Sequence, residues 1–304
     1  MKLKLLTPGN PKTLKGTRRG YFPLVLHLSP ANASGNEVCP ARTKFCTAVC
    51  LNISGRGGIR ILPKMAPEER ARINNIQAAR LRRTKMFFYE RRRFAELLER
   101  DIEYALEYLE SHSVKEIRSG KPVFERLAPG DPRMIPCIRL NGTSDIEWET
   151  LPMIRGKTVM EAYPDVQFYD YTKLPKRRTP RNYHLTYSWN EQKRAAERSE
   201  YYFAVGVNTA VVFSTRRGDP LPETWRGRRV IDGDEYDMRF LDPRGVYVGL
   251  RAKGFARIPE LADGFTVWVD REAENSPLPK ADFDGGDVFA DYDDLFGHVE
   301  WGEE

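Results

Sequence analysis

The sequence predicts an α/β fold with parallel strands, arranged as a partial or full β/α barrel related to the TIM barrel. Short apolar runs alternate with polar connections and helical segments in the second half of the chain, as parallel architectures require. Several runs end in polar turns that contain glycine, which is typical of an edge that carries a binding site. With 304 residues, 40% of them hydrophobic, the chain can bury a substantial core. We expect one β/α-barrel-like catalytic domain over residues 1–280 and an acidic, flexible tail over 281–304.

The first predicted strand and the first predicted helices flank a long loop. Tyr21 to Leu28 is an apolar run suited to a buried strand. Residues 29–60 form a loop that is long enough to suggest a function of its own. The segment 67–109 is predicted to be helical, because Pro67 and two acidic residues suit a first turn. Phe94 to Leu109 then show apolar residues at helical spacing.

Further strands are predicted from apolar runs after residue 110. A charged helix is expected between two of them, over residues 191–201. Because helical segments separate the strands, we expect the strands to pair in parallel and to end at one common edge, called here the carboxyl edge. The predicted strands cover residues 134–140, 166–171, 183–188, 203–214 and 245–250.

The charge of the chain is unevenly distributed. Residues 281–304 hold nine acidic residues and no Lys or Arg, so the remaining chain has 49 basic and 34 acidic residues, a net charge of +15. Such a body attracts polyanions such as nucleotides and nucleic acids, although a soluble basic enzyme has the same character. No apolar run of about 18 residues is present, which excludes a membrane-spanning helix. Because Pro8 interrupts the N-terminus too early for a signal peptide, we expect a cytoplasmic protein.

Three cysteines within twelve residues are the strongest chemical signal. Cys39, Cys46 and Cys50 follow the first predicted strand, and clustered thiols in the cytoplasm are more often metal ligands than disulfides. Thiolates favour zinc or iron–sulfur clusters, and three protein ligands would leave one coordination position open for chemistry. The spacing of six and then three residues suits a loop wrapped around a bulky [4Fe–4S] cluster. Zinc, or no metal at all, is the alternative.

A fourth ligand could come from Cys137, His27 or His184. All three lie in apolar runs. A cysteine in such a run acts as a small hydrophobic side chain, and a histidine there is more often a core group with satisfied hydrogen bonds. We therefore expect Cys137 in the core and each histidine in the core or at the rim, with ligand duty as the alternative.

Polar turns at the carboxyl edge supply candidate cofactor and substrate contacts. The turn Asn141-Gly142-Thr143-Ser144-Asp145 could let the backbone approach a cofactor, or could cap a helix. Asp170, Thr172 and Lys173 place a carboxylate, a hydroxyl and an amine at a strand end, as a substrate site or as an ion pair. Further candidates at this edge are Ser188, Asn190, Glu191, Arg251 and Lys253.

Two charged segments could bind ligands of opposite charge. The acidic residues 231–237 could hold a divalent cation, but they lack the ligand spacing of an EF-hand loop, so we expect a solvated turn. The arginines of the helical segment could contact nucleic acid or form a solvated helix face. They are Arg80, Arg82, Arg83, Arg91, Arg92 and Arg93.

The chain resembles the phage gene product 88 family over most of residues 1–255. The resemblance is carried by the N-terminal motif Leu6-Thr7-Pro8-Gly9-Asn10-Pro11-Lys12 and by the three cysteines with Pro40. It continues through residues 139–145, 168–173, 182–186 and 240–243. A phage-encoded protein would act in the host cytoplasm.

A second similarity is to radical S-adenosylmethionine enzymes. These enzymes place three cysteines on the loop after the first strand of a partial or full β/α barrel, usually spaced by three residues and then two. The similarity implies that Cys39, Cys46 and Cys50 hold a [4Fe–4S] cluster and that Asn141 to Asp145 contact S-adenosylmethionine. The remaining candidates at the carboxyl edge would then face the substrate.

Three functional hypotheses result. The first is a radical-S-adenosylmethionine-like iron–sulfur enzyme that acts on a nucleotide or nucleic acid. The second is a zinc-containing base-modifying enzyme of the transglycosylase type, with Asp145 or Asp170 as nucleophile or base. The third is a non-enzymatic module that binds nucleic acid or a host protein through its basic helices.

Overall fold

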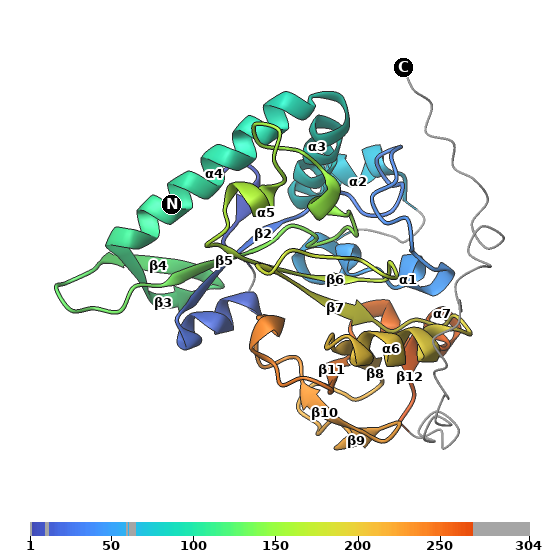
Figure 1. The fold of residues 1–304 in the computed structure, drawn as a ribbon. Helices are drawn as coiled ribbons and strands as arrows, with labels where there is room; N and C mark the ends of the chain where they lie inside the picture. The colour runs from blue at the N-terminus through green and yellow to red at the C-terminus, as the bar shows by residue number, and fades with distance from the viewer. Residues whose placement is uncertain (1, 10–11, 59, 61–64, 270–304) are drawn as a thin grey trace.

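One ten-stranded sheet runs through the computed structural model, which describes residues 2–9, 12–58, 60 and 65–269 (Figure 1). The central strands pair in parallel, which confirms the predicted α/β class with a mostly parallel sheet. In sheet order the strands are β1 (Leu6–Thr7), β2 (Tyr21–Leu26), β5 (Ile135–Arg139), β6 (Gln167–Thr172), β7 (Tyr183–Ser188), β8 (Thr209–Phe213), β11 (Tyr247–Arg251), β10 (Arg228–Asp232) and β9 (Thr224–Trp225). A further short strand, β12 (Thr266–Val267), pairs with β8.

The sheet of the described residues is open, so the expected full barrel is not confirmed. Strands β2, β5, β6, β7, β8 and β11 follow one another in chain order, as they would in part of a β/α barrel. The order then reverses, because β10 lies beyond β11. Short antiparallel strands cover both edges, β1 beside β2 and β9 beside β10, and the parallel strands therefore have no free edge with which to close.

The predicted helical segment 67–109 is three helices rather than one. Asn74 and Glu90 leave the helical conformation, and the Asn74 side chain accepts hydrogen bonds from the backbone N–H groups of Ile76 and Gln77 to begin the second helix. The α-helices are α1 (Lys44–Ala48), α2 (Pro67–Ile73), α3 (Asn75–Tyr89), α4 (Arg91–Ser111), α5 (Val159–Ala162), α6 (Ala195–Ala204) and α7 (Pro259–Ala262). Short 3-10 helices cover Thr13–Arg19, Leu51–Ile53, Gly55–Gly58, Trp148–Thr150, Arg239–Leu241 and Gly254–Arg257.

Two layers enclose the first strands of the sheet. Helices α3, α4 and α5 cover one face of β2, β5 and β6, where Phe94 and Trp148 belong to the main hydrophobic core (Figure 1). The opposite face is covered by residues 236–241, and Met238 packs there against Cys137 and Tyr169. Cys137 is therefore a core residue, as predicted.

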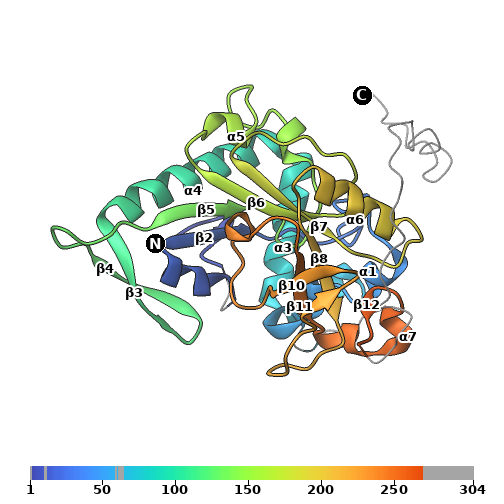
Figure 2. The same cartoon turned by 60° about the horizontal axis from the view of Figure 1, so that its bottom comes forward.

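The later strands are covered by α6 on one face and by α7 with the cysteine loop on the other. Figure 2 shows both helices beside these strands. Phe203 of α6 packs against Val211 and Tyr247, while Val49 joins the apolar residues of α7. The hairpin β3 (His112–Arg118) and β4 (Lys121–Arg126) forms a separate two-stranded sheet that projects beyond α4.

None of the described helices is long and apolar enough to cross a membrane. The acidic tail predicted over 281–304 lies outside the described residues.

Candidate functional site at the carboxyl edge

The cysteine loop is fixed by a carboxylate from the end of β7. Thr43 caps helix α1 by accepting a hydrogen bond from the backbone N–H of Cys46 at 3.1 Å. Glu191 accepts one hydrogen bond from the Thr43 hydroxyl at 2.8 Å and another from the Phe45 backbone N–H at 3.1 Å. The unpaired N–H groups at a helix N-terminus favour a negative charge. Glu191, a predicted substrate residue, therefore positions the loop that carries the cysteines.

The predicted cofactor turn, residues 141–145, packs directly against the end of β2. The Gly142 N–H donates to the Leu26 carbonyl at 3.0 Å. A Cβ atom at Gly142 would lie 2.5 Å from the same carbonyl oxygen, so this close approach requires glycine. The next carbonyl, that of Thr143, lies 3.9 Å from the Cys39 thiol. The turn and the first cysteine are therefore neighbours, as the sequence predicted.

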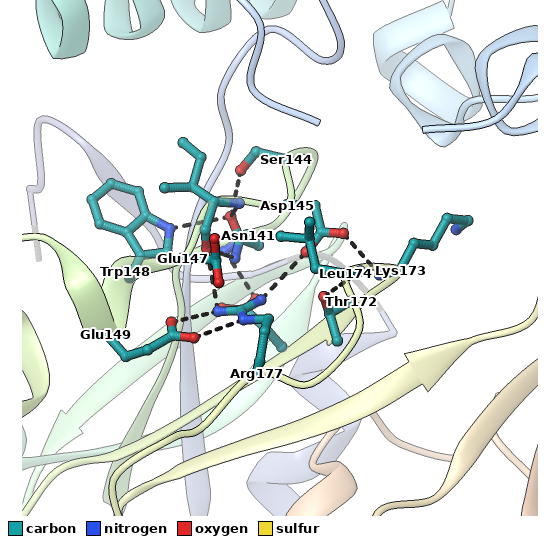
Figure 3. A network of polar contacts seen from close by, with 12 residues as sticks. Asn141, Ser144, Asp145, Glu147, Trp148, Glu149, Thr172, Lys173, Leu174 and Arg177 are labelled. Carbon is teal, nitrogen blue, oxygen red and sulfur yellow. Dashed lines mark hydrogen bonds and ion pairs between the residues drawn. The ribbon is translucent and has the colours of Figure 1, made fainter. Parts of the chain in front are cut away.

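Asn141 uses its side chain to shape this turn (Figure 3). Its Oδ1 accepts hydrogen bonds from the Ser144 hydroxyl at 2.8 Å, the Ile146 N–H at 2.9 Å and the Trp148 indole N–H at 3.1 Å. The polar side chains predicted to contact a cofactor are thus engaged within the protein: Asn141 with Ser144, Thr143 with the Leu28 carbonyl, and Asp145 with the Lys173 N–H.

Arg177 is a site residue that the sequence did not reveal. Its guanidinium is fully buried and donates to both oxygens of Glu149, at 2.8 and 2.6 Å, and to Asp145 at 3.3 Å (Figure 3). A third contact, at 3.1 Å, reaches the Tyr183 hydroxyl. Burial raises the pKa of Asp145, and Arg177 opposes this shift. Arg177 lies in a run of basic residues, and nothing in that run distinguishes it from Arg178.

Lys173 presents an amine that has no hydrogen bond or ion pair among the described residues. Its backbone N–H donates to Asp145 at 2.8 Å, while its side chain leaves the Arg177 network (Figure 3). The ammonium lies 5.6 Å from the centre of the Phe265 ring. Burial lowers the pKa of Lys173, but the acidic groups around it, with Cys46 and Asp145 foremost, outweigh burial and raise it overall. A cation therefore stands beside the cysteine loop.

The three thiols lie close enough to influence one another electrostatically. Burial raises the pKa of Cys39, and the neighbouring Cys50 and Cys46 add to the shift. Burial also raises the pKa of Cys50, where the nearby cations Arg80 and Lys173 act in the opposite direction. Without a metal these two thiols hold their protons at neutral pH, so metal binding would have to release protons.

The three thiols have the chemistry of metal ligands but are not arranged as a metal site. As they stand, no three His, Cys, Asp or Glu side chains within the described ranges are gathered closely enough to hold a metal ion. The Cys39 sulfur accepts a hydrogen bond from the Ala31 N–H at 3.3 Å, so the thiols would have to turn toward one another. Of the suggested fourth ligands, Cys137 packs against Tyr169 and Met238 in the core, and the buried Nε2 of His184 has no hydrogen-bond partner among the described residues.

The family model of gene product 88 matches residues 3–268, which include the site residues described above. The chain belongs to the gene product 88 family. No curated protein and no solved structure gives a match. The resemblance inferred from the motif residues is therefore confirmed for this family, while the similarity to radical S-adenosylmethionine enzymes stays a hypothesis.

In this gene product 88 chain, Arg251 and Lys253 serve as partners of the acidic segment 231–237. Arg251 pairs with Asp232 at 2.8 Å, and Lys253 pairs with Asp234 at 2.8 Å. Asp237 of the same segment is 1% exposed. The expected solvated turn is therefore wrong, because basic residues from neighbouring strands and loops neutralise the segment and hold it against the sheet.

Five of the six predicted arginines of helices α3 and α4 have partners within the protein. Arg80 donates to the Asn52 carbonyl at 3.0 Å, and Arg83 donates to the Lys4 carbonyl at 3.4 Å, so both are engaged with the protein. Three others also have partners: Arg91 lies over the Phe87 ring, Arg92 pairs with Glu96 and Arg93 pairs with Glu90. Arg82 is exposed.

Several other predicted site residues stabilise the ends of strands. Asn190 is buried and accepts a hydrogen bond from the Gln192 N–H at 3.0 Å. The Thr172 hydroxyl accepts one from the Leu174 N–H at 3.0 Å. Ser188 is the last residue of β7 and pairs with Ala210 of β8.

Asp170 lies beneath the site rather than in it. Its side chain is completely buried and accepts hydrogen bonds from the Asn141 N–H and the Tyr183 hydroxyl, both at 2.9 Å. Burial raises its pKa to about 7, although Arg139, 3.6 Å away, acts in the opposite direction. In this position Asp170 supports the turn at Asn141 and has no surface with which to touch a substrate.

Replacing Asp170 with asparagine is expected to change how stability depends on pH. The folded pKa of about 7 exceeds the ordinary value of 3.8, so between these values the folded state binds more protons than the unfolded state. The contribution of Asp170 to stability therefore falls as pH rises, by at most about 1.4 kcal/mol per pH unit. Chemical denaturation between pH 4.5 and 7.5 should show the wild type losing stability relative to Asp170→Asn.

Two histidines also make stability depend on pH, and comparing the two proteins removes their contribution. Burial lowers the pKa of His27 to about 3 and that of His184 to about 4, so both add stability as pH rises. Because the two proteins share these histidines, their effect cancels in the difference. A difference that does not vary with pH would show that Asp170 titrates at its ordinary value.

Proposed function

We propose that this protein is an iron–sulfur enzyme of the radical S-adenosylmethionine type, in which Cys39, Cys46 and Cys50 hold a [4Fe–4S] cluster. The observation that carries the proposal is the Lys173 amine at the carboxyl edge, which has no hydrogen bond or ion pair among the described residues and lies beside the loop of the three cysteines. Three thiolates around an iron–sulfur core carry net negative charge, and neighbouring cations stabilise such a charge.

The protein residues would hold and shield the reacting groups. Lys173 and Arg80 offset the negative charge of the thiolates. The Lys173 ammonium is also placed to pair with a carboxylate or a phosphate, since it has no hydrogen bond or ion pair among the described residues. Glu191 and the glycine-containing turn at Gly142 fix the loop and the neighbouring backbone.

When bound, the cluster would supply the electron that cleaves S-adenosylmethionine and so generates a radical able to take hydrogen from the substrate. The basic body of the chain favours an anionic substrate, and a nucleotide or nucleic acid matches that charge.

Anaerobic purification followed by iron, zinc and sulfide analysis tests the proposal. We expect a brown protein that absorbs near ~400 nm and contains about four iron and four sulfide ions per chain. A colourless protein with one zinc and no iron would overturn it and would favour the zinc-containing base-modifying enzyme. A protein that binds neither metal would favour a non-enzymatic binding module.

A further inference from the structure

A pocket of about 220 Å³ lies beside the cysteine loop, at the end of β7. Its walls come from the segment that leads into α6, from the β9–β10 hairpin and from residues 264 and 267. Glu191 belongs to both regions: it lines the pocket, and its carboxylate holds helix α1. The backbone at Gly264 approaches so closely that a Cβ atom there would lie 2.9 Å from that of Glu191. Glu191 thus connects the pocket with the cysteine loop.

Two indole rings and a guanidinium form one side of this pocket. The rings of Trp189 and Trp225 meet edge to face, with centroids 4.7 Å apart. The Arg226 guanidinium carbon lies 5.3 Å from the first ring and 5.0 Å from the second. Trp225 is buried in the core, whereas Trp189 is only partly buried. Flat aromatic and guanidinium surfaces of this kind stack on planar ligands.

The hairpin turn fixes the position of Arg226. Trp225 pairs with Arg228, which leaves Arg226 and Gly227 as a two-residue turn with φ angles of +48° and +76°. Positive φ at both positions is typical of the tight hairpin turn that matches the twist of its strands. The buried Nε of Arg226 has no hydrogen-bond partner in the described structure. A buried N–H without a partner is costly, and the Arg226 guanidinium is held instead against the two indole rings.

The polar groups left unpaired around the pocket are donors. Gln192 accepts a hydrogen bond from Arg198 through its side-chain oxygen at 2.7 Å, which leaves its NH₂ group without a partner among the described residues. Lys193 is exposed at the same wall. The Glu191 carboxylate is already engaged with Thr43 and Phe45. A matching ligand is therefore planar, rich in hydrogen-bond acceptors, and neutral or anionic.

We propose that this pocket binds the base of a nucleotide, with its phosphate near Lys193 and Arg226. This inference rests on the proposed function for its nucleotide substrate and names the subsite that would recognise the base. Pockets for drug-sized ligands span roughly 300–1,000 Å³, so this smaller pocket suits a single ring system rather than a complete cofactor. Stacking on Trp189 would place the base next to Glu191 and thereby next to the cysteine loop.

The proposal is tested by measuring, with calorimetry, the equilibrium binding of nucleoside 5′-monophosphates to the full chain. Guanosine and uridine monophosphates are compared with ribose 5-phosphate, which lacks the base. We expect ribose 5-phosphate to bind at least about ten-fold more weakly, and Trp189→Ala to weaken nucleotide binding about ten-fold or more, as the loss of one stacked base predicts. Trp189→Phe keeps an aromatic surface and should retain most of the affinity.

Arg229→Ala is the matched control for Arg226→Ala. Arg229 is exposed on the same hairpin and does not line the pocket. Of these two variants, only Arg226→Ala should weaken nucleotide binding. Equal affinity for ribose 5-phosphate and the nucleotides, or unchanged binding by a folded Trp189→Ala or Arg226→Ala variant, would overturn the base pocket.

The test does not depend on a cluster. A protein that binds nucleotides through Trp189 but contains no iron would refute the proposed enzyme and keep the pocket. An iron-containing protein that binds no nucleotide would refute the pocket and keep the iron–sulfur proposal.

Discussion

Replacing Cys50 with alanine is expected to remove the metal centre, lowering the iron content of anaerobically purified protein at least about ten-fold. A cluster held by three thiolates loses one third of its protein ligands in this variant. The half-buried cations near Cys50, which are Arg80 and Lys173, would then lack the negative charge that they offset. Iron and sulfide analysis, together with the absorbance near ~400 nm, measures the loss.

Cys137→Ala is the matched control for this prediction. Cys137 is buried, whereas Cys50 is half-buried, and Cys137 packs against Tyr169 and Met238 on the face of the sheet that residues 236–241 cover. Its replacement should cost about 1 kcal/mol of stability through the small cavity left behind and should leave the iron content unchanged. Equal loss of iron in both variants would show that Cys137 is a ligand, whereas iron retained in Cys50→Ala would exclude the three-cysteine site.

Replacing Arg177 with alanine is expected to lower the free energy of unfolding by about 3–5 kcal/mol, because removing one partner leaves buried charges without compensation. Glu149 would lose a bidentate partner and Asp145 its nearest cation. Asp145 also holds the backbone of Lys173, so the turn and the amine should lose their positions together. Urea denaturation monitored by circular dichroism measures the change.

Two variants separate this effect from a general loss of positive charge. Arg178 is exposed, so Arg178→Ala should change stability by no more than about 0.5 kcal/mol. Arg177→Lys keeps the charge but loses the planar fork and should cost an intermediate amount, about 1.5–3 kcal/mol. Similar stability in Arg177→Ala and Arg178→Ala would contradict the buried clamp.

Most central strands could be predicted because their apolar runs are short and bounded by polar residues. The run 183–188 matches β7 at both ends, and the run 134–140 matches β5 to within one residue. The strand predicted over residues 203–214 was partly wrong, since β8 begins only at Thr209. Tyr202 and Phe203 belong to α6, where they pack against Tyr187 and Tyr247. An apolar run alone does not distinguish a buried helix end from a strand.

The closed barrel could not be decided from the sequence. Chain order predicted parallel neighbours, but the pairing of edge strands depends on contacts between distant segments. The two-residue strands β1 and β9 are too short to show a periodic pattern. The position of β10 beyond β11 reverses the chain order, and periodicity along the sequence does not reveal the order of strands in a sheet.

Within the candidate site, the sequence placed the three thiols on one loop after the first strand, because both features are local. It also placed the turns at residues 141–145 and 170–173 at the same edge, because parallel strands end together. It did not distinguish Lys173, whose amine has no ion pair within the part of the chain that the structure describes, from the paired Arg251 and Arg177, since each is simply a basic residue after or near a strand.

The sequence by itself determined the family, the mostly parallel sheet and the loop that carries Cys39, Cys46 and Cys50. The tertiary structure alone decided which charged side chains face those thiols and which are neutralised. Glu191 reaches Thr43 across 148 residues of chain, and Asp237 reaches Arg139 across 98. Charge is a local property of the sequence, but the partner of a charge is set by the packing of distant segments, and that partner decides whether the charge can meet a ligand.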